Sequence, residues 1–479
     1  MTVHLESFMS RSSALRLATE YFDSGRFQRD LQRRIALPTE SQNPARADEL
    51  ATYLCEEIAP ALAALGFETR QIVNPVEGAP PLLLARRIES VEAVTVLMYG
   101  HGDVVNGQEG RWQQDRSPWQ LSPDGERWYG RGTADNKGQH SINLGALAAA
   151  IPAADGKLGC NLKMIFEMGE ELGSPGLYEA CRDHADYLEA DLFLASDGPR
   201  LAASSPTLFL GSRGALQFKL VLDTGNGAHH AGNWGGVLRN PATVLANAAA
   251  SLVDGRGVIR VPGLRPRNVS ERVRSLVRDF AVGSDAGDPV LDAHWGEPGL
   301  SAGERLFAWN TLELIAFEAG NAQRPVGAIP ARAQAVFQLR FVVGTVWEDV
   351  QQSLRRHLDE HGYADVQIEI QAAAPATRLD PDDAWVRLAT GSLQETCGKP
   401  VTILPNLGGT IPNHCFSEAL GLPTLWMPHS YPSCSQHAPD EHLLAPVARE
   451  GLQLMAGLLW DIGQQGRQVR QQRAQSAAA

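Results

Sequence analysis

The chain has 479 residues, of which 43% are apolar and 20% charged, and its net charge is −13 at pH 7. That length exceeds one typical hydrophobic core, so we expect two domains, and the composition excludes wholesale disorder and a fibrous chain. The acidic balance disfavours a nucleic-acid partner, because phosphate binding needs a concentrated basic surface.

The first 22 residues contain no apolar stretch of signal-peptide length, and no later run approaches the ~20 apolar residues that cross a bilayer. We therefore expect a cytoplasmic protein without a membrane partner. The cysteines are spread without CxxC pairing, which indicates reduced and mostly buried thiols. They are Cys55, Cys160, Cys181, Cys397, Cys415 and Cys434.

Apolar periodicity predicts an α/β domain in the first 211 residues, since strands alternate with helices there. The predicted elements are a helix over 44–65 that Gly66 ends, strands at 94–99, 162–166 and 191–195, and a helix around 142–147. The strand at 94–99 leads directly into GlyHisGlyAsp at 100–103, so its carboxyl end carries polar side chains.

From residue 212 the pattern changes to alternating strands, in the order β-α-β-β-α-β of a ferredoxin-like unit. We predict strands at 216–222, 311–317, 334–343 and 366–370, a helix after AsnPro at 240–241, and a second helix with a Thr345–Glu348 capping box. Mixed α/β character resumes after residue 373, so residues 212–373 are predicted to be inserted into a domain made of 1–211 and 374–479. Residues 463–479 have almost no apolar content and are predicted to fray.

Polar side chains cluster in five short segments where strands are expected to end. The segments are HisGlyAsp at 101–103, GlyArgGlyThrAlaAspAsnLysGly at 130–138, GluMetGlyGluGluLeuGlySer at 167–174, AlaSerAspGlyPro at 195–199 and HisAlaProAspGlu at 437–441. Singly each is weak, because an Asp in such a turn is more often a cap than a ligand. Functional sites, however, collect at the carboxyl ends of strands in open α/β sheets, so the segments are predicted to converge.

Metal chemistry is the use that the residue types favour. The adjacent pair Glu170–Glu171 lies between an apolar strand and a glycine turn, where two like charges are costly unless a cation neutralises them. Imidazole and carboxylate without thiolate suit zinc, cobalt or manganese. HExxH and HxxEH helices are absent from the sequence, which disfavours a single-helix metalloprotease.

With these segments in this order, the sequence resembles the M20 family of metallopeptidases and deacylases over roughly residues 45–460. The resemblance implies an α/β, zinc-exopeptidase-like catalytic domain with a mixed central sheet and an inserted α+β lid domain. It implies two Zn²⁺ ions, with Co²⁺ or Mn²⁺ as alternatives. The metal ligands that it implies are His101 and Asp197 on one ion, Glu171 and His437 on the other, and Asp135 as the bridge.

The resemblance also assigns the residues around the metals. Asp103 would fix the orientation of His101, Glu170 would be the general base and acid, and the Asp135–Asn136 peptide would be cis. In the lid, His230 would stabilise the oxyanion, often from the other subunit of a dimer, and Arg340 would hold a substrate carboxylate.

One departure from the family bears on the substrate. Dipeptidase-like members have an arginine and an acid before the GlyGly(Ser/Thr)IlePro loop, whereas Asn406 and Leu407 precede GlyGlyThrIlePro at 408–412 here. We expect Asn406 and Gly409 to contact substrate, and a carboxylate anchor to be missing or moved. The substrate would then be less charged than a simple dipeptide.

The implied activity is hydrolysis of the amide bond of a dipeptide or an N-acyl amino acid by a metal-activated water, with Glu170 as the base. A biosynthetic deacylase of the acetylornithine or succinyl-diaminopimelate kind is the alternative among enzymes. A non-catalytic binding protein that retains the fold is a further alternative. A homodimer formed through the lid is implied as well.

Overall fold

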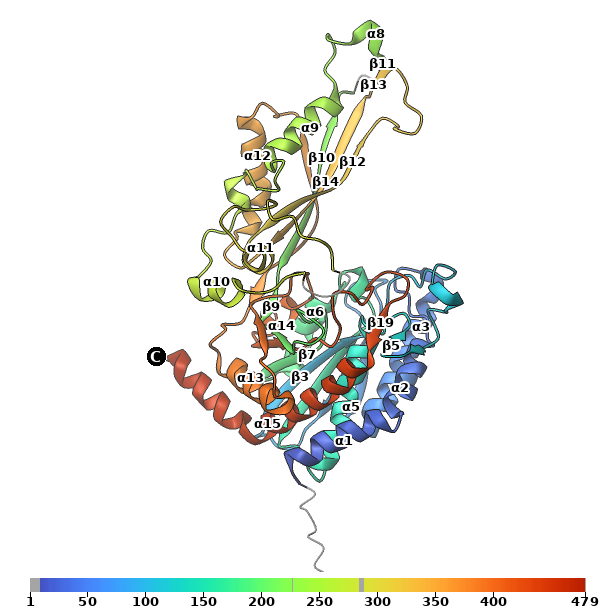
Figure 1. Cartoon of the computed structure of the whole chain (residues 1–479), viewed down its shortest axis with the longest axis vertical. Coiled ribbons are helices and arrows are strands. Elements are labelled where there is room, and N and C mark those ends of the chain that lie inside the picture. The colour runs from blue at the N-terminus through green and yellow to red at the C-terminus, as the bar shows by residue number, and fades with distance from the viewer. Residues whose placement is uncertain (1–8, 226, 284–287, 479) are drawn as a thin grey trace, which may run out of the picture.

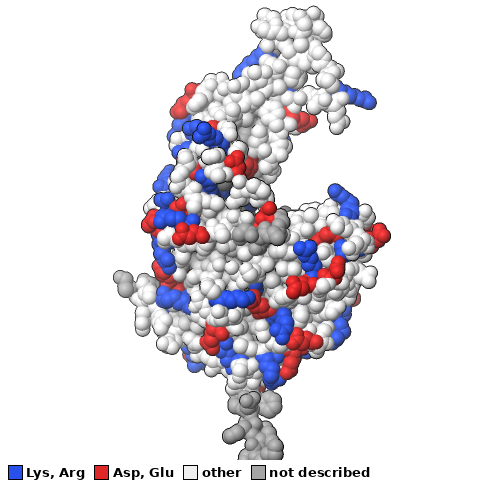
Figure 2. Space-filling model, viewed as in Figure 1, with Lys and Arg blue, Asp and Glu red and all other residues white. Residues whose placement is uncertain are grey.

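The computed structural model describes residues 9–225, 227–283 and 288–478. It shows a broad catalytic domain and a narrower lid that rises from it (Figure 1). Figure 2 shows that the molecule is hollowed between the tip of the lid and the catalytic domain, and that charges of both signs are interspersed on this face. Among the described residues, no helix is long and apolar enough to cross a membrane.

The catalytic domain is built on a sheet of eight strands, which is mixed as the family resemblance implies. Its central strands β6, β3 and β7 run parallel to one another, so their carboxyl ends meet at one edge. In spatial order the strands are β1 (Glu68–Ile72), β2 (Leu82–Arg87), β6 (Cys160–Glu167), β3 (Val94–His101), β7 (Leu192–Ala195), β18 (Thr424–Trp426), β8 (Thr207–Phe209) and β17 (Thr402–Leu404).

Helices cover both faces of this sheet, which is why β3 and β6 are almost wholly buried. On one face lie α1 (Arg11–Asp23), α2 (Arg26–Ile35), α5 (Lys137–Ala153), α13 (Ala384–Cys397) and α15 (Ala445–Ala478). On the other face lie α6 (Leu177–Asp183), α10 (Glu271–Val277), α11 (Ala302–Phe307) and α14 (His414–Ser417). The helical run predicted over 44–65 is divided into η1 (Pro44–Arg46), α3 (Ala47–Thr52), η2 (Tyr53–Ile58) and α4 (Ala59–Ala64).

The lid has the predicted ferredoxin-like order. Its antiparallel sheet runs β12 (Thr311–Ala319), β14 (Arg332–Phe341), β10 (Gly214–Asp223) and β15 (Gln367–Ala374). Buried and half-buried residues alternate along β10 and β14, because α9 (Pro241–Leu252) and α12 (Val350–Glu360) cover only one face. The tip carries β11 (His229–His230), α8 (Ala231–Trp234) and β13 (Ala328–Ile329) (Figure 1).

The connection between the two parts is a pair of short strands. β9 (Gly211–Ser212) leads into the lid and pairs with β16 (Thr377–Arg378), where the chain returns. The domain limits at 212 and 373 stay a prediction. Within that range, the helices α10 and α11 pack on the catalytic domain, since Val277 and Phe307 share a buried cluster with Phe209.

Two local predictions are wrong. The capping box is not formed, because the hydroxyl of Thr345 bonds to the side chain of Asn310 and α12 begins only at Val350. Residues 463–478 are not frayed but continue α15. Val469 is buried, and Arg470 and Arg473 form ion pairs with Asp191 and Asp383, so tertiary contacts hold a segment whose composition is unfavourable.

Candidate metal centre

The site lies where β3, β6 and β7 end. His101 is the last residue of β3 and is in register with Glu167, the last residue of β6. Glu170 and Glu171 follow in the turn η4 (Glu170–Leu172), and Asp197 follows β7. Because these strands are parallel neighbours, their carboxyl ends bring three of the five polar segments together.

Two groups of three donor residues share one carboxylate. In the first group, the Nε2 atom of His101 is 3.0 Å from Oδ1 of Asp135 and 3.6 Å from Oδ2 of Asp197. In the second group, Nε2 of His437 is 3.0 Å from Oδ2 of Asp135 and 3.2 Å from Oε2 of Glu171. The donor atoms within each group all lie within 4.8 Å of one another. Asp135 therefore offers one oxygen to each group, which is the arrangement a bridging ligand needs.

The electrostatics of the cluster favour cations. Burial and repulsion by Asp135 raise the pKa of Glu171 to about 7 and that of Asp197 to about 6. Hydrogen bonds with Asp135 and Glu171 raise the pKa of His437 to about 10. Oε1 of Glu171 is buried without a hydrogen-bond partner in the described chain. Crowded carboxylates and an orphaned oxygen fit divalent metal ions, which neutralise such groups.

Asp103 orients both sides of the centre. Its Oδ1 atom lies 3.2 Å from Nδ1 of His101, and its two oxygens accept hydrogen bonds of 3.1 Å from the backbone N–H groups of Glu170 and Glu171. Asp103 and His101 are fully buried. One carboxylate thus fixes an imidazole ring and the glutamate turn together, and the second of these contacts was not expected from the sequence.

Glu441 positions the loop that carries Asp135. It accepts hydrogen bonds from the backbone N–H groups of Gly132, Ala134 and Asp135, and the Arg131 guanidinium donates to it at 2.6 Å. Sequence reasoning assigned no role to Glu441 or Arg131. The position of Glu441 at the end of the His437 segment is the one signal that could have found it. The Asp135–Asn136 peptide within this loop is cis, as the resemblance implies.

Glu170 lies beside the donor cluster. It lines a cavity of about 540 Å³ together with Asp135, Asp197 and His437. Burial raises the pKa of Glu170 well above its usual range. Its place next to both donor groups suits proton transfer to and from a reacting molecule in the cavity.

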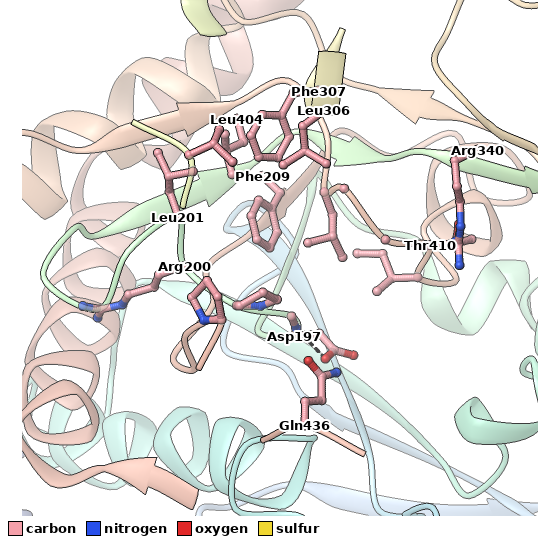
Figure 3. A pocket seen from close by; sticks show the side chains of 18 of the residues that line it. Asp197, Arg200, Leu201, Phe209, Leu306, Phe307, Arg340, Leu404, Thr410 and Gln436 are labelled. Atoms are coloured by element: carbon pink, nitrogen blue, oxygen red, sulfur yellow. Dashed lines mark hydrogen bonds between the residues drawn. The ribbon is translucent and has the colours of Figure 1, made fainter. Parts of the chain in front are cut away.

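The lid brings some of the predicted residues to this cavity and not others. Arg340 lines it and donates a 2.6 Å hydrogen bond to the hydroxyl of Thr410, and Gly409 lines it as well (Figure 3). Asn406 is buried and is not among the described residues that line the cavity. His230 lies exposed on β11, at the far tip of the lid (Figure 1).

Two carboxylate–imidazole donor groups that share Asp135 at the edge of an α/β sheet suit a pair of divalent ions, which is the kind of site that two-metal hydrolases use. The model of peptidase family M20/M25/M40 matches residues 97–461, and the chain belongs to this family.

Curated relatives are dipeptidases. The chain is 26% identical to the Cys-Gly metallodipeptidase DUG1 of Saccharomyces cerevisiae over 90% of this chain and 94% of that protein. It is 31% identical to the DUG1 of Candida albicans, but over only 50% of this chain and 52% of the relative's length. It is 26% identical to the human beta-Ala-His dipeptidase over 80% of this chain and 78% of that protein.

Solved structures share the whole fold. The S. cerevisiae dipeptidase Dug1p has a TM-score of 0.78 at 23% identity and covers 96% of this chain and 99% of its own. The M20 metallo-carboxypeptidase Sso-CP2 from Sulfolobus solfataricus has a TM-score of 0.77 at 24% identity and covers 91% and 99%.

Proposed function

We propose that this chain is a binuclear metal-dependent hydrolase that cleaves the amide bond of a dipeptide or an N-acyl amino acid. The observation that carries the proposal is Asp135, whose two oxygens face two separate donor groups while Glu170 lies beside them. The relatives named for Cys-Gly and beta-Ala-His support a dipeptide as substrate. Membership of the family by itself already supports hydrolysis of an amide bond as the class of reaction.

His101, Asp135 and Asp197 would hold one ion, and Asp135, Glu171 and His437 the other. Bound divalent ions would lower the pKa of water and polarise the scissile carbonyl. Glu170 would accept the proton of the attacking water as its oxygen adds to the carbonyl carbon. Glu170 would then give that proton to the nitrogen as the C–N bond breaks, so the products are a carboxylic acid and an amine.

The donor chemistry favours zinc, with cobalt or manganese as alternatives. Metal analysis of protein purified without chelators would identify the ion and its stoichiometry. Two equivalents per chain are expected, together with hydrolysis that a chelator abolishes and the metal restores. One equivalent, or hydrolysis that resists the chelator, would contradict the binuclear proposal.

Arg340 with Thr410 would bind the carboxylate of the leaving amino acid. The guanidinium lies in the cavity, and burial lowers its pKa. Asn406 and Leu407 replace the arginine and acid expected from the family, so Arg340 would be the remaining anchor. Comparing the hydrolysis of a dipeptide with that of its C-terminal amide tests whether Arg340 binds a carboxylate. A strong preference for the free acid supports this anchor and contradicts a less charged substrate.

The chain would act as a cytoplasmic homodimer formed through the lid. β12 is an edge strand of the lid sheet and exposes Leu314, Ile315 and Phe317, each by more than 40% of its surface. Residues 227–238 at the tip contain no Lys, Arg, Asp or Glu, and Trp234 and Val237 are exposed there. His230 of one subunit would then reach the cavity of the other. Light scattering coupled to size exclusion would measure the mass in solution.

A further inference from the structure

The cavity beside the donor cluster has two unlike arms. Arg340 and Thr410 lie on one side, and a set of apolar side chains gathers on the other, with Asp197 below and between them (Figure 3). We call the second set the apolar arm. It consists of Leu201, Phe209, Leu306, Phe307, Leu404 and Leu407.

The apolar arm is preformed. Phe209, Phe307, Leu404 and Leu407 belong to the buried cluster between the sheet and its covering helices, and each is less than 10% exposed. Leu201 and Leu306 pack against the same cluster. Side chains held in a packed core do not rearrange freely, so the arm keeps its shape without a ligand.

Among the described residues that line the cavity, Arg200 and Asp288 are the charged side chains outside the two donor groups, Glu170 and Arg340. The guanidinium of Arg200 points away in Figure 3 and pairs with Glu450 at 2.6 Å, and Asp288 accepts a hydrogen bond of 3.1 Å from the hydroxyl of Ser433. An apolar group placed in the apolar arm would bury its surface against the carbon atoms of the side chains there. It would not separate a charged side chain from its partner. A charged or strongly polar group would lose its hydration without a fixed counter-charge from the arm itself.

The two arms and the donor cluster between them give the substrate a direction. We propose that the apolar arm binds the acyl side of the scissile amide and selects a bulky aliphatic or aromatic group there. The inference rests on the proposed function, because the scissile carbonyl must lie at the donor cluster and the carboxylate of the leaving amino acid at Arg340. The favoured substrates are dipeptides with a large apolar first residue and amino acids with a branched apolar acyl group.

Two matched substrate pairs test this proposal on the metal-loaded, full-length protein. Gly-Ala is compared with Leu-Ala, and N-acetylalanine with N-(4-methylpentanoyl)alanine, so that the leaving amino acid is constant. The second pair repeats the comparison without an α-ammonium group. We expect kcat/KM to be at least about tenfold higher for the bulky member of a pair. A ratio below tenfold in both pairs overturns the proposal.

A variant that narrows the apolar arm tests whether the arm itself causes the preference for a bulky apolar group. A Cβ atom added at Gly408 would lie 3.5 Å from Cδ1 of Leu306 and 3.8 Å from Cε1 of Phe307, which are ordinary contacts. Gly408→Val therefore adds side-chain volume beside Leu306 and Phe307, and its Cβ atom makes only ordinary van der Waals contacts. We expect the ratio between bulky and small substrates to fall at least about tenfold. Gly391→Val, at an open position on α13, is the matched control and should keep the ratio.

Failure of the inference and failure of the proposed function give different results. If the two members of both pairs are cleaved equally well, the hydrolase stands and the apolar arm falls. If no amide is cleaved, the hydrolase falls, and calorimetry with 4-methylpentanoate and acetate then decides the arm. Binding at least tenfold tighter for the larger acid supports it, and equal binding overturns it. Should Gly408→Val not fold, the wild-type ratios decide alone.

Discussion

The catalytic domain and the lid contribute to the cavity in different ways. The catalytic domain supplies a dense, buried set of groups, in which Asp103 and Glu441 hold the ligand-bearing segments through backbone N–H groups. The strands of the lid supply one cationic side chain, Arg340 on β14, whereas His230 lies at the far tip of the lid. The catalytic domain therefore holds a preorganised set of donor groups, and the lid strands contribute a cation to the same cavity.

The junction between them reinforces this division. Arg213, which follows β9, donates to the backbone carbonyls of Leu306 and Arg340 and to the hydroxyl of Thr311. Burial lowers the pKa of Arg213 to about 9. The strand that carries Arg340 is thus tied to the rim of the catalytic domain, whereas among the described residues of one chain none brings the tip of the lid to the cavity.

Loss of the shared carboxylate should have the largest effect. Asp135→Asn removes one charge from both donor groups, so we expect metal content well below two equivalents and a loss of at least ~10³-fold in kcat/KM. Metal analysis and hydrolysis of Leu-Ala measure both. Asp365→Asn, at an exposed lid carboxylate paired with Arg239, is the control. Two retained equivalents with normal activity would remove Asp135 from the centre.

Glu170→Gln should separate proton transfer from metal binding. Glu170 belongs to neither donor group, so we expect two metal equivalents to remain while kcat falls by ~10³-fold, within the range for a general base. The control is Glu395→Gln, at an exposed position of α13. Loss of metal in Glu170→Gln would instead make this residue a ligand and exchange its role with that of Glu171.

The sequence alone predicted the parts of the site that lie at the ends of strands. Apolar runs predict β3, β6 and β7, and parallel neighbours must bring His101, Glu171 and Asp197 to one edge. The family resemblance supplied the ligand roles of all five residues, including Asp135 and His437 on loops that no periodicity places, and it supplied the cis peptide. The ferredoxin-like order of the lid also followed from its alternating strands.

Other features depend on tertiary contacts that a local pattern does not encode. Glu441 looked like one more acid in a polar segment, and only the folded loop shows its three backbone donors. Thr345 has a partner from another segment, Asn310, that outcompetes the capping box. The polar composition of 463–478 predicted fraying, whereas ion pairs and buried Val469 hold the helix. The relation of His230 to the cavity depends on assembly, which one chain does not contain.

His230→Ala tests the contribution of the lid tip. If His230 acts in the partner's cavity, we expect kcat to fall by ~10²-fold, the effect of losing one oxyanion donor. Co-expression of His230→Ala with Glu170→Gln should then recover about a quarter of the wild-type activity, since half of randomly paired dimers have one intact site of two. His229→Ala, the neighbour on β11, is the control. Absence of recovery would confine each site to one chain.

Arg340→Gln tests the part of the lid that already lies in the cavity. Removal of a charge-assisted hydrogen bond should raise KM for Leu-Ala by about 10- to 100-fold and leave the C-terminal amide of Leu-Ala nearly unaffected. The KM values of the two substrates are the measurement. Arg332→Gln, exposed at the other end of β14, is the control. An equal rise for both substrates would show that Arg340 shapes the cavity and does not bind a carboxylate.

Arg473→Ala should have the smallest effect, because it changes the catalytic domain far from the edge of the sheet at which the donor groups lie. Arg473 donates to Asp383, the residue that caps α13, but its side chain is 41% exposed. Solvent screens such a pair, so we expect the free energy of unfolding to fall by no more than about 1 kcal/mol, with kcat/KM unchanged. Chemical denaturation measures the first quantity, and Arg467→Ala, at an exposed position of α15, is the control. A loss of activity in Arg473→Ala alone would mean that the terminal helix is coupled to the metal centre, and the chemistry would then not be contained in the network around Asp135.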